Sequence, residues 1–311
     1  MKRHWLRKIL AAILVTVLFF LLVVMPAVTV AVYKMNFDVR YGDFQWDESI
    51  ARPFDGLWME ECQFSSNRGQ ILAGAKYSRP GQSPKGLLVM AHGFGGGGHT
   101  GYLEYIDWFT ANGYLVFAYD ATGNDKSEGE VIGGLPQGVI DLDYALDYVQ
   151  SLPEYEGLPI MLFGHSWGAY SVGNVLNVHP EVSAVVMEAG FNASIDMIEQ
   201  EGRVIAGDYI DFLLPYVRFY EWLKYGKYAG FSAIEGFENT DAAIMILHGG
   251  MDKVVLPENG YDQFYEAFGD SDRFEFLWYE YGNHNLVSSG NRLKPDIARE
   301  IIDFYDSHCS R

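Results

Sequence analysis

Cysteine is scarce in this chain of 311 residues, which contains only Cys62 and Cys309. Two thiols are too few for a scaffold held together by disulfides or for a cysteine metal site. The two residues lie near opposite ends of the folded region, so an oxidising exterior would permit a bridge between them. Two free buried thiols are an equally ordinary arrangement, and the sequence leaves the choice open.

Basic residues are also few. The chain has 22 Lys and Arg against 41 Asp and Glu, and five of the basic residues lie at or before Lys34. The rest of the chain therefore has 17 basic and 41 acidic side chains, a net charge of −24. Such a surface repels phosphate backbones, so we predict no nucleic-acid partner. Internal repeats and low-complexity tracts are lacking as well, which indicates one large domain of about 250 residues.

A stretch of 25 residues, Ile9 to Tyr33, contains no charge. About 20 apolar residues span a bilayer, so this stretch is long enough for a transmembrane helix. Four basic residues lie before it, within 1–8, and outnumber those that closely follow it, which predicts a cytoplasmic N-terminus and an outward-facing domain. A cleaved signal peptide, with Thr29-Val30-Ala31 as its cleavage site, would make the protein secreted, but its apolar region is usually only about 7 to 15 residues. We predict a single-pass cell-membrane protein with a signal anchor at 9–33 and a juxtamembrane connector at 34–56.

Residues 57–311 alternate short apolar runs with helix-length segments. Leu57 to Phe64 and Gln70 to Tyr77 flank a turn-rich interval and predict an antiparallel hairpin. Strands are predicted at 86–91, 114–119, 158–163, 182–187, 243–247 and 274–279, and helices at 102–111, 135–152, 167–178, 257–268 and 295–306. This pattern predicts an α/β fold with a mostly parallel sheet and helices on both faces. The one long departure is about 190–240, where we predict an inserted helical cap.

The motif Gly164-His-Ser-Trp-Gly168 stands between an apolar run and a helical pattern. Strand, sharp turn and helix in that order form the nucleophile elbow, which places Ser166 at the tip of the turn. The glycines have a physical reason, because the elbow brings strand and helix too close for a Cβ on either side. The N-terminus of the new helix points its positive end at Ser166, which suits a developing oxyanion.

A serine hydroxyl needs a base, which in this arrangement follows the last strand. Four histidines follow Ser166, namely His179, His248, His284 and His308. His179 stands at a helix end, where we expect it to cap carbonyl groups, and His308 is close to the C-terminus. His284 comes directly after the last predicted strand, and we predict it as the base.

The acid that orients the base should lie between the serine and the histidine. Asp252, four residues past a predicted strand end, is the first candidate, and Glu188 at the end of the 182–187 strand is the alternative. The glycine-rich run after the first parallel strand, His92-Gly-Phe-Gly-Gly-Gly-Gly98, lets backbone N–H groups approach a ligand. We predict an oxyanion hole from the N–H groups of Phe94 and Trp167.

These motifs together resemble the α/β-hydrolase family, in particular its serine esterases, lipases and aminopeptidase-like members. The resemblance covers about 57–306 and rests on five segments in order: His92-Gly-Phe-Gly95, Tyr119 to Gly129, Gly164 to Gly168, His248-Gly-Gly-Met-Asp252 and Gly282-Asn-His284. It implies Ser166 as nucleophile, Asp252 as acid and His284 as base. Members of this family often have Arg and His where this chain has Thr122 and Asn124, a departure that bears on the substrate and leaves the three catalytic groups untouched.

The implied function is hydrolysis of an ester, a thioester or an amide through an acyl-enzyme. A serine peptidase of the aminopeptidase type is the alternative within this class. The segment from Tyr209 to Phe231 is rich in aromatic residues, which favours a cap over the site and a small-molecule substrate with an apolar acyl part. A buried face that packs on the sheet and a segment that rests on the membrane interface are the alternatives.

Two alternatives belong to other classes. Gly93-x-Gly95-x-x-Gly98, with Asp120 at the next strand end, is close to a dinucleotide-binding fingerprint and would fit an NAD-dependent oxidoreductase. A non-catalytic binding module on the same fold is the second. A nucleotide site would leave Ser166, Asp252 and His284 without a purpose, so we predict no cofactor. We also predict no metal, because His92 and His99 lack a third ligand at a helical spacing.

Overall fold

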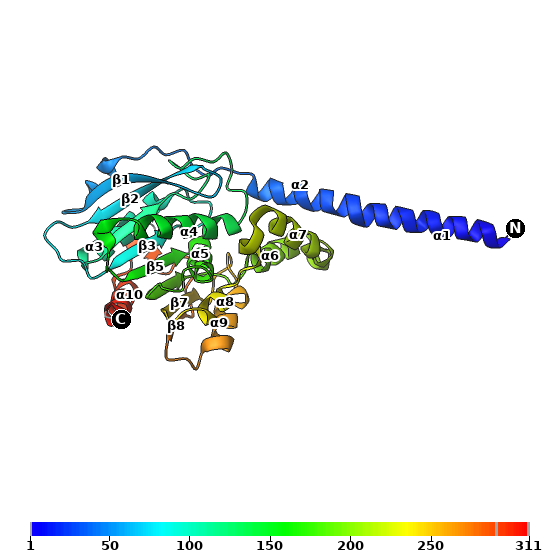
Figure 1. Ribbon diagram of the computed structural model, residues 1–311. Coiled ribbons are helices and arrows are strands. Elements are labelled where there is room, and N and C mark those ends of the chain that lie inside the picture. Colours follow the sequence, from blue (N-terminus) through cyan, green and yellow to red (C-terminus); the bar gives the residue numbers. More distant parts are fainter. Residues whose placement is uncertain (1, 290–291, 310–311) are drawn as a thin grey trace.

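The chain opens with a long helix that projects away from the rest of the molecule (Figure 1). The computed structural model describes residues 2–289 and 292–309, and in it this helix consists of α1 (Lys2–Phe19), a π-helical turn η1 (Phe20–Val24) and α2 (Met25–Phe37). The π turn ends two residues before Pro26. In a regular helix the proline ring would clash with the carbonyl of Leu22, which lies within this turn, and the wider turn relieves that clash. Within the described residues, His4–Phe37 is the one helix long and apolar enough to cross a membrane.

An eight-stranded sheet of order β1-β2-β4-β3-β5-β6-β7-β8 forms the centre of the domain. Its strands are β1 (Trp58–Ser65), β2 (Ile71–Ser78), β3 (Leu87–Ala91), β4 (Leu115–Tyr119), β5 (Ile160–His165), β6 (Ala184–Glu188), β7 (Ala243–Gly249) and β8 (Phe274–Tyr279). β1 and β2 form the predicted hairpin, β2 runs antiparallel to β4, and the remaining neighbours are parallel. The predicted mostly parallel sheet is confirmed, with small shifts at the strand ends.

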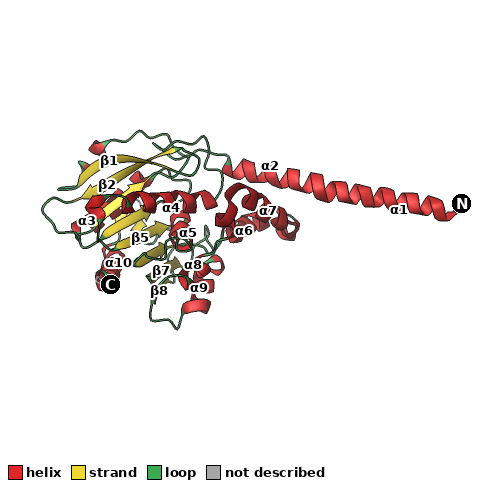
Figure 2. Ribbon diagram, in the orientation of Figure 1, coloured by secondary structure: helices red, strands yellow, loops and turns green. Residues whose placement is uncertain are grey.

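Helices cover both faces of this sheet (Figure 2), which explains why the central strands β3, β6 and β7 are buried at every position. Along β3, Leu87 and Val89 belong to the core on one face, and Leu88 and Met90 to the core on the other. The first face is covered by α4 (Pro136–Gln150), α5 (Trp167–Val175), α8 (Ala233–Glu238) and α9 (Tyr261–Phe268), and the second by α3 (Leu103–Ala111) and α10 (Pro295–His308). Short elements complete the chain: the 3-10 turns η2 (Glu48–Ala51), η3 (His99–Tyr102), η4 (Pro153–Tyr155) and η7 (Pro257–Asn259), and the strands β9 (Ser288–Ser289) and β10 (Arg292–Leu293).

The segment between β6 and β7 is helical, as predicted for a cap. It contains α6 (Ser194–Ala206), the 3-10 turn η5 (Gly207–Phe212), α7 (Leu214–Tyr225) and the 3-10 turn η6 (Gly226–Gly230), followed by α8. Figure 1 shows α6 and α7 beside α2, and contacts join α7 to α2. The last part of the predicted insertion is different, because Ala233 and Phe237 of α8 are fully buried in the main core. The part of the segment that stands off the sheet therefore ends before α8.

The residues after α2 pack against the domain. Arg40 donates hydrogen bonds to the carbonyl groups of Ser127 and Gly129, and the buried indole of Trp46 donates to the Asp120 carboxylate. These contacts hold the end of the long helix close to the sheet. Cys62 and Cys309 are both free thiols, so the bridge that the sequence would allow is not formed.

Candidate active site

Ser166 lies in the tight turn between β5 and α5. Its backbone has φ 57° and ψ −115°, a conformation that residues with a side chain rarely adopt. A Cβ on Gly164 would lie 2.3 Å from the carbonyl oxygen of Gly168, and one on Gly168 would lie 2.0 Å from that of Ala91. The structure thus confirms the elbow and the reason for its glycines. Because α5 begins at Trp167, its free N–H groups point toward the serine.

Asp252 and His284 come together from two loops. The Nδ1 atom of His284 is 2.8 Å from Oδ2 of Asp252, whose other oxygen accepts the backbone N–H groups of Val254 and Val255 at 2.8 and 3.1 Å. Burial opposes ionisation of Asp252, but the hydrogen bond and charge of His284 together with the two N–H groups outweigh it and hold the pKa of the carboxyl below its usual range. The carboxylate is therefore charged and oriented toward the imidazole.

Glu188, the alternative acid, has a different partner. It ends β6 fully buried, and its Oε1 atom accepts the backbone N–H groups of Leu286 and Val287 at 2.7 and 2.8 Å. In the part of the chain that the structure describes, no hydrogen bond joins it to the ring of His284. Its carboxylate instead holds the loop that carries His284, because Leu286 and Val287 follow His284 by two and three residues.

A second network links the two loops that flank Ser166. The backbone N–H of Gly93 donates to the hydroxyl of Tyr102 at 2.9 Å, and this hydroxyl lies 2.9 Å from Nδ1 of His165. The other ring nitrogen of His165 is 3.1 Å from the carbonyl oxygen of His284. A carbonyl only accepts, so this nitrogen carries the proton and Nδ1 accepts from Tyr102. Burial lowers the pKa of His165, which keeps the ring neutral and suits this assignment.

Sequence reasoning missed His165 and Tyr102. His165 fills a variable position of the Gly-x-Ser-x-Gly motif, and Tyr102 lies in a turn before a helix, so neither stands in a recognisable pattern. Only the contact between them shows that they support the glycine-rich loop and the His284 loop.

A cavity of about 750 Å³ lies against Ser166. His284 lines it too, as do the predicted oxyanion residues Phe94 and Trp167, whose rings pack edge to face with centroids 5.5 Å apart. The cap contributes mainly apolar side chains to the wall, namely Met197, Ile198, Ile205, Ile210, Leu213 and Val217. No hydrogen bond within the described residues joins the Ser166 hydroxyl to His284, although both line the cavity. Catalytic hydrogen bonds of this kind often shorten only when substrate binds.

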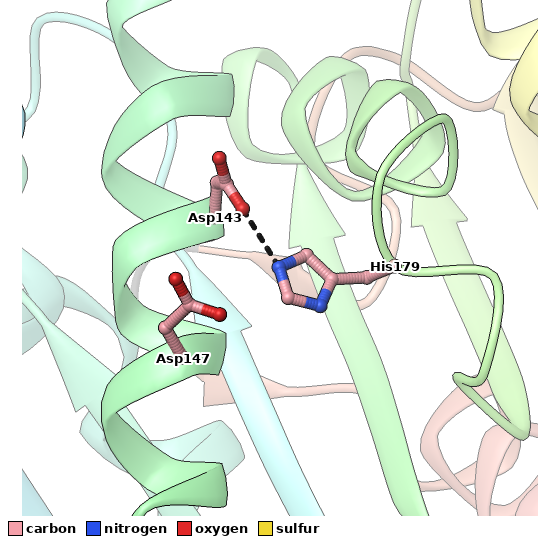
Figure 3. Close-up of side chains that lie close together, drawn as sticks. All are labelled: Asp143, Asp147 and His179. Atoms are coloured by element: carbon pink, nitrogen blue, oxygen red, sulfur yellow. Dashed lines mark hydrogen bonds and ion pairs between the residues drawn. The ribbon is translucent and has the colours of Figure 1, made fainter.

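The prediction that His179 caps a helix end is wrong. The ring of His179 lies between two carboxylates, with Nε2 2.8 Å from Asp143 and Nδ1 2.8 Å from Glu181, and Figure 3 shows Asp147 one turn further along α4. Burial opposes the charge, but the two carboxylates outweigh it and raise the pKa of the ring. The three groups Asp143, Asp147 and His179 are close enough to hold a metal ion. A metal ligand needs an unprotonated ring nitrogen, however, and both nitrogens of His179 already face carboxylates, so the cluster fits a charged histidine.

The glycine-rich loop also lacks the free acid that a dinucleotide site requires. Asp120 is fully buried, and its carboxylate accepts the backbone N–H of His99 at 2.8 Å and the Trp46 indole at 2.7 Å, with His99 Nδ1 also at 2.7 Å. The ribose-binding acid of such a fingerprint has to face the ligand. This geometry speaks against the oxidoreductase alternative.

Comparisons with known proteins agree with the fold. Residues 82–215 match a family described as serine aminopeptidase, S33, and this match includes Ser166 but ends before Asp252 and His284. An esterase of Pyrococcus furiosus superposes with a TM-score of 0.66 at 15% identity over 88% of this chain and 99% of that one. An acylaminoacyl peptidase of Pyrococcus horikoshii has a TM-score of 0.62 at 14% identity over 85% of this chain and 44% of that one. These matches show that the chain has the α/β-hydrolase fold and resembles a family of that fold over residues 82–215.

The curated relatives are similar over shorter segments. Human monoglyceride lipase is 38% identical over 103 residues, which cover 32% of this chain and 32% of that protein. Mouse monoglyceride lipase is 31% identical over 151 residues, 47% of this chain and 48% of that protein. The chain thus spans between about a third and a half of the length of the curated relatives it matches.

Proposed function

We propose that this chain is a serine hydrolase that cleaves a carboxylic ester through an acyl-enzyme. Ser166 is the nucleophile, His284 the general base and Asp252 the acid that orients it. The observation that carries the proposal is the hydrogen bond between Asp252 and His284 at the edge of a cavity that the elbow serine also lines. A thioester or an amide would follow the same chemistry.

In the proposed mechanism each of these groups has one task. His284 removes the proton of Ser166 as the hydroxyl attacks the carbonyl carbon, and the charge of Asp252 stabilises the imidazolium that forms. The N–H groups of Phe94 and Trp167 receive the oxyanion. His284 then gives its proton to the leaving group, and water deacylates the serine by the reverse sequence.

The apolar wall of the cavity favours an ester with an apolar acyl part. We expect kcat/KM to rise roughly fourfold for each methylene that enters the cavity, until it is full. The cavity wall also contains Glu201, a carboxylate that would suit the amino group of an aminopeptidase substrate. Assays of p-nitrophenyl esters against aminoacyl nitroanilides separate the two activities. Better turnover of the nitroanilides, lost in Glu201→Gln, would establish the peptidase instead.

The nucleophile can be tested directly. We expect Ser166→Ala to lose ester hydrolysis by on the order of 10⁶ in kcat and to lose fluorophosphonate labelling, with an unchanged thermal midpoint. Ser151→Ala, which alters an exposed serine elsewhere, serves as the control and should label like the native protein. Labelling that persists in Ser166→Ala would assign the nucleophile to another residue.

We also propose that residues 9–33 anchor the protein in the cell membrane as a single span, with the N-terminus in the cytoplasm and the hydrolase domain outside. The uncharged length of this segment and the basic residues before it support the proposal. Cleavage after Ala31 would cut α2 in its middle and remove Thr29, a buried residue that is only 3% exposed. The packing of α2 therefore favours an anchor that stays attached.

A further inference from the structure

The end of the long helix is part of the wall of the catalytic cavity. Five residues of α2 line the same cavity as Ser166 and His284, namely Thr29, Val32, Tyr33, Asn36 and Phe37. They share one side of the helix, because their spacing of three and four residues follows the helical repeat. The neighbouring face is open to solvent at Met35, which is 82% exposed. One side of α2 is thus built into the site.

A buried hydrogen bond fixes this side of α2 to the cap. The hydroxyl of Tyr33 donates to Oε1 of Glu221 on α7 at 2.7 Å, and Ser194 at the start of α6 donates to the same oxygen at 2.8 Å. Tyr33 is 4% exposed and Glu221 is 1% exposed. Breaking such a bond would leave a buried polar group unsatisfied, so α2 and the two cap helices are held as one unit.

A row of aromatic rings joins α2 to the elbow. The ring of Phe37 is 4.6 Å from that of Tyr33 and 6.1 Å from that of Phe94, which in turn is 5.5 Å from the ring of Trp167 beside the nucleophile. Contacts at these distances stabilise the packing of each ring on the next. The position of α2 therefore bears on the shape of the cavity close to Ser166.

The cavity wall and the uncharged segment overlap in sequence. Thr29, Val32 and Tyr33 belong to both, and Phe37 lies only about 6 Å further along the helix axis at a rise of about 1.5 Å per residue. Several large apolar side chains of the cap next to α2 are exposed to solvent: Ile205, Tyr209, Phe212, Phe219, Trp222 and Leu223. If 9–33 spans a bilayer, the cavity opens within about two helical turns of its surface.

We propose that the cavity-lining residues of the anchor helix determine specificity, because they form the wall that contacts the acyl chain of a membrane-borne ester; they are Thr29, Val32, Tyr33, Asn36 and Phe37. This inference rests on the proposed function, because it assigns the acyl chain to a cavity in which Ser166 reacts. The anchor then does more than hold the enzyme at the membrane. It sets the length of acyl chain that the cavity accepts.

The test compares two substitutions on the same helix in the full chain, kept in detergent micelles. Val32→Trp places a large ring on the cavity wall, and Met35→Trp places the same ring on the exposed side. Val32 is 44% exposed, so the larger side chain has room to be accommodated. The probes are ethyl and hexadecyl fluorophosphonates, with which Oγ of the serine forms a bond to phosphorus and fluoride leaves. The quantity measured is the ratio of the hexadecyl to the ethyl labelling rate constant.

We expect Val32→Trp to lower this ratio about tenfold or more, since losing two buried methylenes at roughly fourfold each suffices for that change. Met35→Trp should keep the native ratio. If thermal unfolding shows that Val32→Trp is not folded, Asn36→Trp makes the same change one turn along the wall. Equal ratios in the wall variants and Met35→Trp would overturn the inference while leaving the hydrolase intact. Absence of labelling by the ethyl probe in the native chain would overturn the proposed function, and this inference with it.

Discussion

Two buried carboxylates, Asp252 and Glu188, serve His284 in different ways. Asp252 accepts a hydrogen bond from the imidazole itself, whereas Glu188 accepts two backbone N–H groups of the chain that follows His284. Removing the charge of the first changes the electrostatics of the base directly. Removing the Glu188 carboxylate should instead move the loop of His284, the proposed base, so we expect Glu188 to act as a positioning residue.

This difference predicts unequal effects of two isosteric substitutions. Asp252→Asn should lower kcat for a short-chain ester by on the order of 10⁴. The imidazolium loses its counter-charge, and the ring loses the carboxylate that fixes its tautomer. Glu188→Gln should cost far less, since the amide oxygen still accepts the N–H groups of Leu286 and Val287. Steady-state kinetics of the two variants beside the native enzyme provides the measurement. A larger loss in Glu188→Gln would make Glu188 the acid.

At the scale of elements, the molecule depends on how α2, α6 and α7 pack together. Their junction contains Glu221, whose carboxylate is almost fully buried, and burial raises its pKa to about 7 in spite of the hydrogen bonds from Tyr33 and Ser194. The folded protein therefore holds a proton on Glu221 at pH values where the unfolded chain has released it. Such a group makes stability depend on pH.

Protonated Glu221 contributes to the free energy of unfolding. We expect this stabilisation to be fully present below the ordinary pKa of glutamate and to be lost as the pH rises through about 7. The shift corresponds to about 3 kcal/mol of unfolding free energy between these limits. Glu221→Gln should remove this part of the pH dependence. The measurement is the thermal midpoint of the full chain at pH 5 and pH 8, with Glu238→Gln on the exposed side of α8 as control. An unchanged difference between the two midpoints in Glu221→Gln would show that Glu221 titrates normally.

For the whole molecule, the charge distribution predicts how the long helix and the acidic domain are oriented relative to the membrane. The segment up to Lys34 holds five of the 22 basic residues, and all 41 acidic residues follow it. Positive charge before an uncharged span usually stays on the cytoplasmic side, so we predict that the acidic domain lies outside. The cavity, lined by the end of the same helix, would then face the outer surface of the membrane.

Protease added to intact cells should therefore digest the domain, and the undigested protein should leave the membrane fraction only with detergent. A cytoplasmic reporter fused to the N-terminus should stay protected in the same cells and serves as the control. Two results would contradict the anchor: a domain protected from protease, or a mature N-terminus near Val32, which would indicate a cleaved signal peptide.

The sequence by itself determined the features that local physics controls. Apolar runs of strand length predicted the sheet, because both of its faces are buried, and the glycines of the elbow located Ser166, because no other residue permits so close an approach of strand and helix. The chain order after Ser166 then predicted His284 as the base and Asp252 as its acid, with Glu188 as the alternative, and in the structure Asp252 is the carboxylate that contacts the His284 ring.

Only the tertiary structure decided which groups meet across long separations in sequence. The carboxylate of Glu188 supports a loop about a hundred residues away, and His165 links two loops that no motif connects. Tyr33, whose sequence context indicates only a membrane span, donates a hydrogen bond to Glu221, 188 residues later, and lines the same cavity as Ser166. Such contacts depend on how complete helices and strands pack against one another. Periodicity along the chain therefore does not predict which residue a buried polar group bonds to.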